Sequence, residues 1–378
     1  MKIAKDRRRL LYICDWLPPD FGAVGQYSAM FARELAVKGY DVTLAGLSTF
    51  GNSDYTETMG LGRYREIKLA TASYDKSSAL RRLFWTAWTN TRLLFHLWNH
   101  MRAADTILFT GSPPLFLHWI APANHILKKE LVYRITDFHP ECAIAQAGGG
   151  GCFLKLLYCL TLFWRRQVNR FEALGEDQIT RLREIGIEEK RITLKRDPPP
   201  VFISSETSAL QRPPGTESSL LLLYSGNWGI AHDYRTFVEG YRLHHRHGSA
   251  RFVLWLNAVG AAVNSIENAL SADGLPYVKG APLPLERLAS LLVTPDAHLI
   301  TLSDPFVGFV LPSKVYGCIE SGRPVLFIGS EKSDAHQLCC KSLGSAYERA
   351  DVGDAEACKR ALDRLARMID DDACKANH

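Results

Sequence analysis

The chain has 378 residues, which is long for a single domain; 47% of the residues are hydrophobic and 22% are charged. This composition indicates two globular domains with buried cores and excludes a mainly disordered chain. The net charge of +5 is too small to indicate nucleic-acid binding, and no stretch reaches the ~18 consecutive apolar residues of a membrane span.

The N-terminal segment is charged and has no apolar run of signal-peptide length. The nine cysteines include no Cys-x-x-Cys pair and no Cys/His cluster with zinc-finger spacing. We therefore expect a cytoplasmic protein with reduced cysteines. No basic recognition motif is present, so no nucleic-acid partner is expected.

In the first half of the chain, short apolar runs alternate with helical patterns, which predicts parallel βαβ units. After the first strand and a loop rich in proline and glycine, Tyr27, Phe31 and Leu35 recur at helical spacing, and Gly39 ends this helix. The strands predicted in this half are residues 10–14, 42–46, 107–111 and 131–135.

Residues 196–215 are rich in proline and serine and lack periodicity, which predicts a linker. The alternation then restarts, with strands at residues 220–226, 252–256, 298–302 and 324–329 and helices at residues 286–292, 315–320 and 355–370. The predicted fold class is α/β, with two doubly wound Rossmann-like domains facing a central cleft. The predicted boundaries are an N-terminal domain at 1–197, a linker at 198–217, a C-terminal domain at 218–350, and a last helix at 351–378 that packs back on the N-terminal domain.

The segment YSGNWGIAHD, residues 224–233, has a strand that ends in Gly226 and Asn227 before a helix begins. Small residues let a phosphate approach the backbone, and the start of a helix offers free N–H groups. A tight turn without a ligand is the alternative interpretation.

The segment VLPSKVYGCIESGRPVLFIG, residues 310–329, contains a helix start at Pro312 and Ser313, with Ser313 as the expected cap. Lys314 lies in the first turn, where a cation is unfavourable for the helix dipole. An anion bound at the same end would resolve this conflict. The alternative is an ordinary helix with a surface lysine.

Two further groups follow predicted strands. Gly22 and Gly25 lie between the first strand and the first helix, where a plain flexible loop is the alternative. Asp137, His139 and Glu141 follow the strand at 131–135 and could orient a sugar hydroxyl or move a proton, although such residues are often structural.

Together, the glycine loop, the Asp-x-x-Pro-Glu segment, Ser-Gly-Asn-x-Gly and PSKxYGxxxxGRP resemble family 4 glycosyltransferases of the GT-B fold, over residues 10–329. The branch that this chain resembles builds bacterial exopolysaccharide and O-antigen chains. The resemblance implies a retaining, metal-independent hexosyl transfer from a UDP-, GDP- or ADP-linked sugar. It implies no cofactor besides that substrate.

By position, the resemblance implies that Ser313 and Lys314 hold the donor diphosphate and that Lys314, Asp137 and His139 are catalytic. Glu141 is implied on the acceptor side. The other residues implied to contact the donor are Gly22, Gly25, Gly226, Asn227, His232 and Glu320.

The chain departs from the family at several positions. Many members carry two glutamates eight positions apart, where this chain has Phe309 and Gly317, with Glu320 close by. His232 stands near the place of a missing basic residue, and Thr136 replaces a histidine. These departures leave open which residues contact the ribose and the sugar.

Two stretches, residues 76–104 and 151–171, are aromatic and basic and contain no acidic residue. In the first, Leu80, Phe84, Trp88, Thr91, Phe95 and Trp98 follow helical spacing. Such helices can lie in a membrane interface, so we expect peripheral contact with the inner face of the cytoplasmic membrane. The alternative is two helices packed on the N-terminal sheet with their basic faces in water.

The function predicted is transfer of a sugar from a nucleotide-sugar donor to a lipid-linked or glycan acceptor in polysaccharide biosynthesis. A GT-B-fold sugar-nucleotide epimerase and a non-catalytic nucleotide-sugar-binding partner are the alternatives. The missing glutamate pair favours the last of these.

Overall fold

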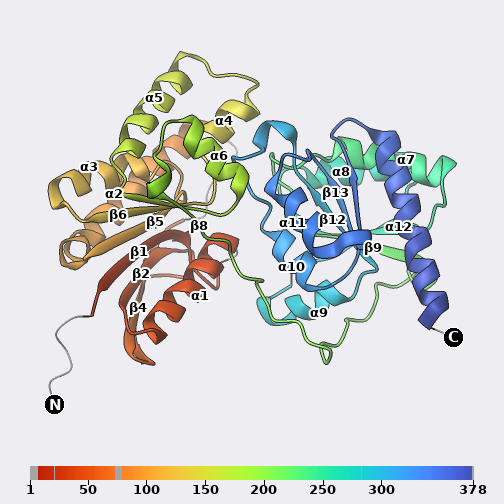
Figure 1. Cartoon of the computed structure of the whole chain (residues 1–378), viewed down its shortest axis with the longest axis horizontal. Coiled ribbons are helices and arrows are strands. Elements are labelled where there is room, and N and C mark those ends of the chain that lie inside the picture. Colours follow the sequence, from red (N-terminus) through yellow and green to blue (C-terminus); the bar gives the residue numbers. More distant parts are fainter. Residues whose placement is uncertain (1–6, 21, 73–78, 282, 377–378) are drawn as a thin grey trace. The chain divides into compact units, whose positions relative to one another are not determined.

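The computed structural model describes residues 7–20, 22–72, 79–281 and 283–376, and the chain forms two compact units, Met1–Arg196 and Asp197–His378 (Figure 1). Lys76 and its neighbours at the start of the first basic stretch lie outside the described residues. Each unit is an α/β domain built on its own sheet.

The first unit contains an eight-stranded sheet with the order β3-β4-β2-β1-β5-β6-β7-β8. Every neighbouring pair is parallel except β3 with β4. The central strands are nearly continuous apolar runs, as expected where helices cover both faces of a sheet. The strands are β1 (Arg9–Trp16), β2 (Asp41–Ser48), β3 (Ser53–Met59), β4 (Gly62–Ala70), β5 (Thr106–Thr110), β6 (Glu130–Ile135), β7 (Arg170–Ala173) and β8 (Ile192–Leu194).

Helix α1 (Ala23–Val37) packs on β1, β2 and β4 and covers one face of this sheet. The crossovers that follow β4 and β5 contain α2 (Ala79–Ala103) and α3 (Leu117–Leu127), and the usual right-handedness of such connections favours the other face for both helices. Both α2 and α5 (Cys152–Arg166) pack on α3, so these three helices form one layer. The shorter helices are α4 (Glu141–Gln146), α6 (Glu176–Glu184) and the 3-10 turn η1 (Glu189–Arg191).

The second unit contains a six-stranded parallel sheet with the order β11-β10-β9-β12-β13-β14. The strand order reverses between β9 and β12, because the chain moves outward from β9 in one direction and later from β12 in the other. The strands are β9 (Leu220–Asn227), β10 (Phe252–Val259), β11 (Tyr277–Lys279), β12 (Ala297–Thr301), β13 (Val325–Ile328) and β14 (Tyr347–Ala350).

Alternate residues of β9 enter different cores. Leu222 and Tyr224 join the larger core beneath α7 (Arg235–His247), α8 (Val263–Ala272) and α12 (Ala355–Ala376), whereas Leu221 and Leu223 pack with Leu291 of α9 (Leu288–Val293). The remaining helices are α10 (Lys314–Glu320) and α11 (Asp334–Leu343), with the 3-10 turns η2 (Leu285–Arg287), η3 (Asp304–Phe306) and η4 (Gly344–Ala346). The second unit is thus a three-layer sandwich (Figure 1).

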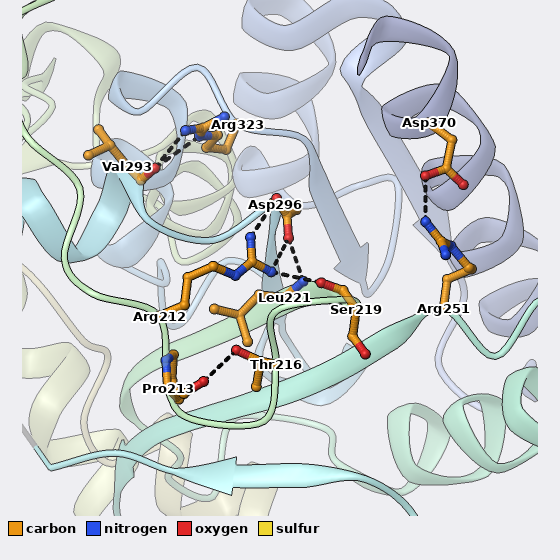
Figure 2. A network of polar contacts seen from close by, with 10 residues as sticks. All are labelled: Arg212, Pro213, Thr216, Ser219, Leu221, Arg251, Val293, Asp296, Arg323 and Asp370. Atoms are coloured by element: carbon orange, nitrogen blue, oxygen red, sulfur yellow. Dashed lines mark hydrogen bonds and ion pairs between the residues drawn. The ribbon is translucent and has the colours of Figure 1, made fainter. Parts of the chain in front are cut away.

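The segment expected to be a linker has no helix or strand but is attached to the second unit (Figure 2). The Arg212 guanidinium forms an ion pair with Asp296 at 2.8 Å and donates to the Ser219 carbonyl. The same carboxylate accepts the Leu221 N–H at the start of β9. This end of the segment is therefore fixed to the sheet that it enters.

The last helix, expected at residues 355–370, extends from Ala355 to Ala376. Its apolar residues lie in the core of the second unit, and it packs on α7 and β14. These contacts cover the apolar side of α12, so packing on the N-terminal unit is not needed to bury it.

Candidate active site

Two neighbouring strands of the second sheet, β9 and β12, end where the strand order reverses, and this is the place where open α/β sheets bind ligands. Gly226, near the end of β9, has a φ of 112°, a left-handed conformation that favours glycine. A Cβ atom at this position would lie 4.0 Å from Cε of Lys314, the first residue of α10. The two segments singled out in the sequence therefore meet at this edge.

Lys314 is an unpaired buried cation. Its Nζ atom is buried without a hydrogen-bond partner and lies 3.1 Å from the centre of the Tyr224 ring. Burial lowers the pKa of Lys314 from 10.5 to about 7. No carboxylate of the described residues contributes to this pKa, so the ammonium has no counter-charge in its own unit. The alternative interpretation, an ordinary helix with a surface lysine, does not fit this buried Nζ atom.

The aromatic ring beneath this ammonium is held rigidly. Tyr224 is fully buried and stacks on Trp228, with 3.6 Å between ring centres and 16° between ring planes. Its hydroxyl donates to the Asn227 carbonyl at 3.2 Å. A cation on the face of an aromatic ring gains some attraction, but less than from an anion. Tyr224 therefore positions Lys314 without neutralising it.

His232 lies beside the same group and is neutral. Its Nδ1 donates a hydrogen bond of 2.6 Å to the carbonyl of Thr301, at the end of β12. Burial, followed by the nearby Lys314 ammonium, lowers the pKa of His232 to about 3. His232 therefore does not supply the positive charge that the family's basic residue would supply.

The remaining predicted donor residues differ in their surroundings. Ser313 occupies the N-cap position of α10, but its side chain makes no capping hydrogen bond, so the cap expected there is absent. Asn227 is exposed at the end of β9. Glu320 is the last residue of α10, about 9 Å of helix rise from Lys314, and so lies at the opposite end of the helix.

Gly317, where many family 4 glycosyltransferases have a glutamate, lies in an apolar setting. A Cβ atom there would be 3.0 Å from Cδ1 of Leu292 and 3.5 Å from Cγ of Pro200. The segment that begins at Asp197 thus packs directly on α10. A side chain at position 317 would require the end of Leu292 to shift and would lie against Pro200.

A pair of carboxyl groups occupies the edge of the first sheet. Asp137 follows β6, and burial, followed by the charge of Asp15 in β1, raises its pKa to about 6. Burial likewise raises the pKa of Asp15 to about 6, against a hydrogen bond from the Ser112 side chain. Asp15 was not predicted from the sequence, because an acid at a strand end has no distinctive local pattern. The two groups are suited to accept hydrogen bonds from hydroxyls or to hold a proton.

Glu141, expected on the acceptor side, has a structural partner. Both of its carboxylate oxygens pair with Arg165 of α5, which is fully buried, and Arg165 also donates to the His139 carbonyl at 3.1 Å. Glu141 therefore holds the turn after β6 against α5, and its place on the acceptor side stays a prediction. Burial lowers the pKa of His139, with Glu141 acting in the opposite direction.

The two loop glycines have different surroundings. A Cβ atom at Gly25 would lie 1.7 Å from the Trp16 carbonyl oxygen, so Gly25 is needed for packing α1 on β1 rather than for exposing backbone to a ligand. A Cβ atom added at Gly22 would meet no other described atom within 4 Å beyond its chain neighbours. Only Gly22 therefore has open space beside it.

A groove of about 530 Å³ lies past the ends of β2 and β4, beside α2. Two indole rings, Trp85 and Trp88, and the Arg92 side chain line it. The hydroxyls of Thr71 and Thr89, also in its lining, are buried without a hydrogen-bond partner. Aromatic rings beside unsatisfied hydroxyls suit a polyhydroxylated ligand.

Comparison with protein-family models and with curated sequences finds no match. Solved structures match nearly the whole chain. WaaG, a glycosyltransferase involved in lipopolysaccharide biosynthesis, has a TM-score of 0.60 at 15% identity, covering 94% of this chain and 90% of that one. A trehalose-6-phosphate protein from E. coli bound with UDP-2-fluoro glucose has a TM-score of 0.61 at 13% identity, covering 96% and 94%. This chain has the GT-B fold.

HepE from Anabaena, solved in complex with UDP, is similar at a TM-score of 0.55 and 10% identity, covering 97% of this chain and 90% of that one. The match to these structures confirms the predicted pair of doubly wound domains. In the described part of the chain, no helix is long and apolar enough to cross a membrane, and no three His, Cys, Asp or Glu side chains gather as metal ligands would.

Proposed function

We propose that this chain is a retaining glycosyltransferase of family 4 that moves a hexosyl group from a nucleotide sugar to a lipid-linked or glycan acceptor in polysaccharide biosynthesis. The observation that carries the proposal is Lys314, a buried ammonium without a carboxylate partner among the described residues, beside Gly226 at the switch point of the second sheet. A diphosphate supplies the missing charge, and the glycine lets it approach the backbone.

Lys314 has a direct chemical role in this proposal. When the bond between the sugar and the nucleotide breaks, negative charge grows on the departing diphosphate. A lysine fixed on a buried ring stabilises that charge without reorganising, and it does so most strongly where water is excluded. The lysine takes the place of a metal ion, so the transfer that we propose is metal-independent.

The family resemblance and the neighbours' ligands support this choice of donor. One similar structure holds UDP-2-fluoro glucose and another holds UDP. One neighbour is named for lipopolysaccharide biosynthesis, which is consistent with a glycan or lipid-linked acceptor. For this chain, the base can be uridine, guanosine or adenosine.

On the acceptor side, we propose that the first unit binds the hydroxyl that attacks the sugar. Asp137 and Asp15 offer carboxyl oxygens at the sheet edge, and His139 lies in the same turn. The groove lined by Trp85 and Arg92 offers stacking surfaces and hydroxyls for the acceptor's sugar rings.

One observation favours a non-catalytic nucleotide-sugar-binding protein as a second candidate. Gly317 and Phe309 replace the glutamate pair of many relatives, and the space at Gly317 is filled by Leu292 and Pro200. Tight nucleotide-sugar binding with no product, over a broad panel of acceptors, would favour this candidate. An isomerised nucleotide sugar formed without an acceptor would instead show an epimerase.

The test is a thermal-shift screen of UDP-, GDP- and ADP-sugars, followed by calorimetry with the best one. At 100 times its Kd, a specific donor should stabilise the protein by about 2.7 kcal/mol. Lys314→Ala should lose most of this affinity and nearly all transfer. Lys341→Ala, which removes an exposed lysine of α11, is the matched control. Unchanged donor binding in Lys314→Ala would overturn the proposal.

A further inference from the structure

Helix α5 has its polarity reversed relative to an ordinary surface helix. Its two buried residues are Thr161 and Arg165, which bond to His118 of α3 and to Glu141. Its exposed side is a row of large apolar residues at helical spacing, Phe153, Leu156, Leu160 and Phe163. A helix on the surface of a globular protein normally buries its apolar row and exposes its polar side.

The first half of α2 shows the same reversal. Thr86, Thr89 and Asn90 are buried, whereas Phe84 and Trp88 are exposed. Phe95 continues the exposed row about two turns further along, and Phe84 and Phe95 are each more than 70% exposed. By contrast, the apolar residues of α12 face the core in the usual way.

The two exposed rows belong to one layer of the first unit, because α2 and α5 both pack on α3. We call Phe84, Trp88 and Phe95 of α2, with Phe153, Leu156, Leu160 and Phe163 of α5, the apolar outer surface. Isolated exposed apolar side chains are common on proteins, but seven on two helices that both pack on α3 indicate an interaction surface.

The charge of these helices identifies the partner's chemistry. Together they carry seven lysines and arginines and no aspartate or glutamate, and only Arg165 among the seven is buried and paired with Glu141. Lys155, Arg166 and Arg102 are exposed. Apolar and aromatic rows flanked by cations match an anionic lipid surface, where rings enter the headgroup region and cations stay with the phosphates.

We propose that α2 and α5 dock the first unit on the surface of an anionic phospholipid bilayer through the apolar outer surface. The helices lie in the plane of the headgroups and do not cross the bilayer. This goes beyond the transfer reaction, because it concerns a surface remote in sequence and unit from Lys314. It favours lipid-linked over soluble acceptors, since docking places the first unit where such acceptors are concentrated.

The test is co-sedimentation of the full chain with two kinds of vesicle. One is an equal mixture of phosphatidylglycerol and phosphatidylethanolamine, and the other is pure phosphatidylcholine. We expect strong binding to the first, weak binding to the second, and weaker binding to the first at high salt. No binding to the anionic vesicles at low salt would overturn the proposal.

The variant Phe84→Glu with Leu156→Glu should reduce the partition onto anionic vesicles at least tenfold. The matched control is Leu61→Glu with Phe202→Glu, which changes two equally exposed apolar residues outside the two helices and should bind like the wild type. All four side chains are exposed, so folding is expected to be intact, and circular dichroism checks this. Equal binding of the two variants would contradict the proposal.

Two further measurements separate lipid from protein partners. Brominated lipids should quench the tryptophan fluorescence of the wild type, because Trp88 enters the headgroup region. The quenching should be smaller in Trp88→Phe, which lacks this indole ring. A wild-type dimer in solution that Phe84→Glu with Leu156→Glu converts to a monomer would show that a second copy covers the surface instead. Donor binding by calorimetry should be the same in all these variants, so failure of docking and failure of the transferase proposal are distinguishable.

Discussion

Burial of Lys314 is expected to lower the stability of the ligand-free protein, and a bound donor diphosphate is expected to restore it. A buried polar group without a hydrogen-bond partner typically costs on the order of 1–3 kcal/mol. Here the group is an ammonium over Tyr224, with no carboxylate among the described residues to balance it. Residues that bind a charged ligand often destabilise the free protein in this way.

Lys314→Met should therefore stabilise the ligand-free protein by about 1–3 kcal/mol at pH 6, while donor binding is lost. The pKa of Lys314 is about 7 in the folded protein and 10.5 without burial, so the unfolded chain holds more protons between these values. The folded wild type consequently gains stability as the pH rises from 7 to 10.5, and the advantage of Lys314→Met shrinks over the same window. Urea unfolding at several pH values measures this difference, and a variant less stable than the wild type at pH 6 would contradict it.

Some residue roles could be predicted from the sequence and others could not. The conflict between Lys314 and the helix dipole is a local pattern, and the structure brings this residue beside Gly226 as expected for a shared ligand. The role of Glu141 could not be predicted, because its partner Arg165 lies 24 residues further along the chain. Asp15 was missed because only the folded sheet brings it near Asp137.

At the scale of elements, the buried strands were predicted best. The apolar runs at 10–14 and 220–226 lie within β1 and β9, because both faces of a parallel sheet are covered. The β3–β4 hairpin was missed, since β3 is mostly exposed and lacks an apolar run. For α5, the sequence left both the exposed and the buried apolar side open, because periodicity identifies two faces of a helix but not which one is buried.

The contact of α1 with β1 yields a sharp test. In Gly25→Ala, the new methyl group would meet the Trp16 carbonyl oxygen, so the first turn of α1 must move away from the strand. We expect a loss of about 3 kcal/mol, the upper end of the usual cost of overpacking. Gly22→Ala is the control, because that position is extended and has open space, and it should change stability by less than about 0.5 kcal/mol. Similar losses for both variants would refute this account.

The attachment of α5 through Arg165 and Glu141 can be tested by a double-mutant cycle. Arg165→Met alone leaves a buried carboxylate without its partner and should cost about 3–5 kcal/mol. Adding Glu141→Gln should recover part of this loss, because the remaining charge is removed. Arg183→Met, which breaks the exposed pair with Glu189, should have little effect. Strictly additive losses in the cycle would show that the two residues do not act as a pair.

At the scale of the whole molecule, the two proposals concern different units. The donor residues are carried by the second sheet and α10, whereas the apolar outer surface is carried by α2 and α5 of the first unit. The division into two doubly wound domains was predictable from the restart of the strand pattern. The boundary lies at Arg196, and the attachment of the following segment to the second sheet was not predictable, because Arg212 and Asp296 are distant in sequence.

Hydrogen exchange should resolve the two surfaces in one experiment. A nucleotide sugar should slow exchange at residues 226–233 and at the start of α10, and anionic vesicles should slow it in α2 and α5. The nucleotide sugar should leave the exchange rates in α2 and α5 nearly unchanged. Anionic vesicles should leave those at residues 226–233 and at the start of α10 nearly unchanged. Protection of α2 and α5 by the nucleotide sugar alone would contradict this separation.

The contact of Leu292 and Pro200 with Gly317 limits which side chains position 317 can accept. An added Cβ atom would lie 3.0 Å from Cδ1 of Leu292, so the end of that side chain must shift, whereas the 3.5 Å contact with Pro200 is an ordinary one. Gly317→Glu should therefore destabilise the protein more than Gly317→Ala, because it also places a carboxylate against apolar side chains. An acidic residue would be accommodated more easily together with a smaller residue at position 292, so the two positions constrain each other.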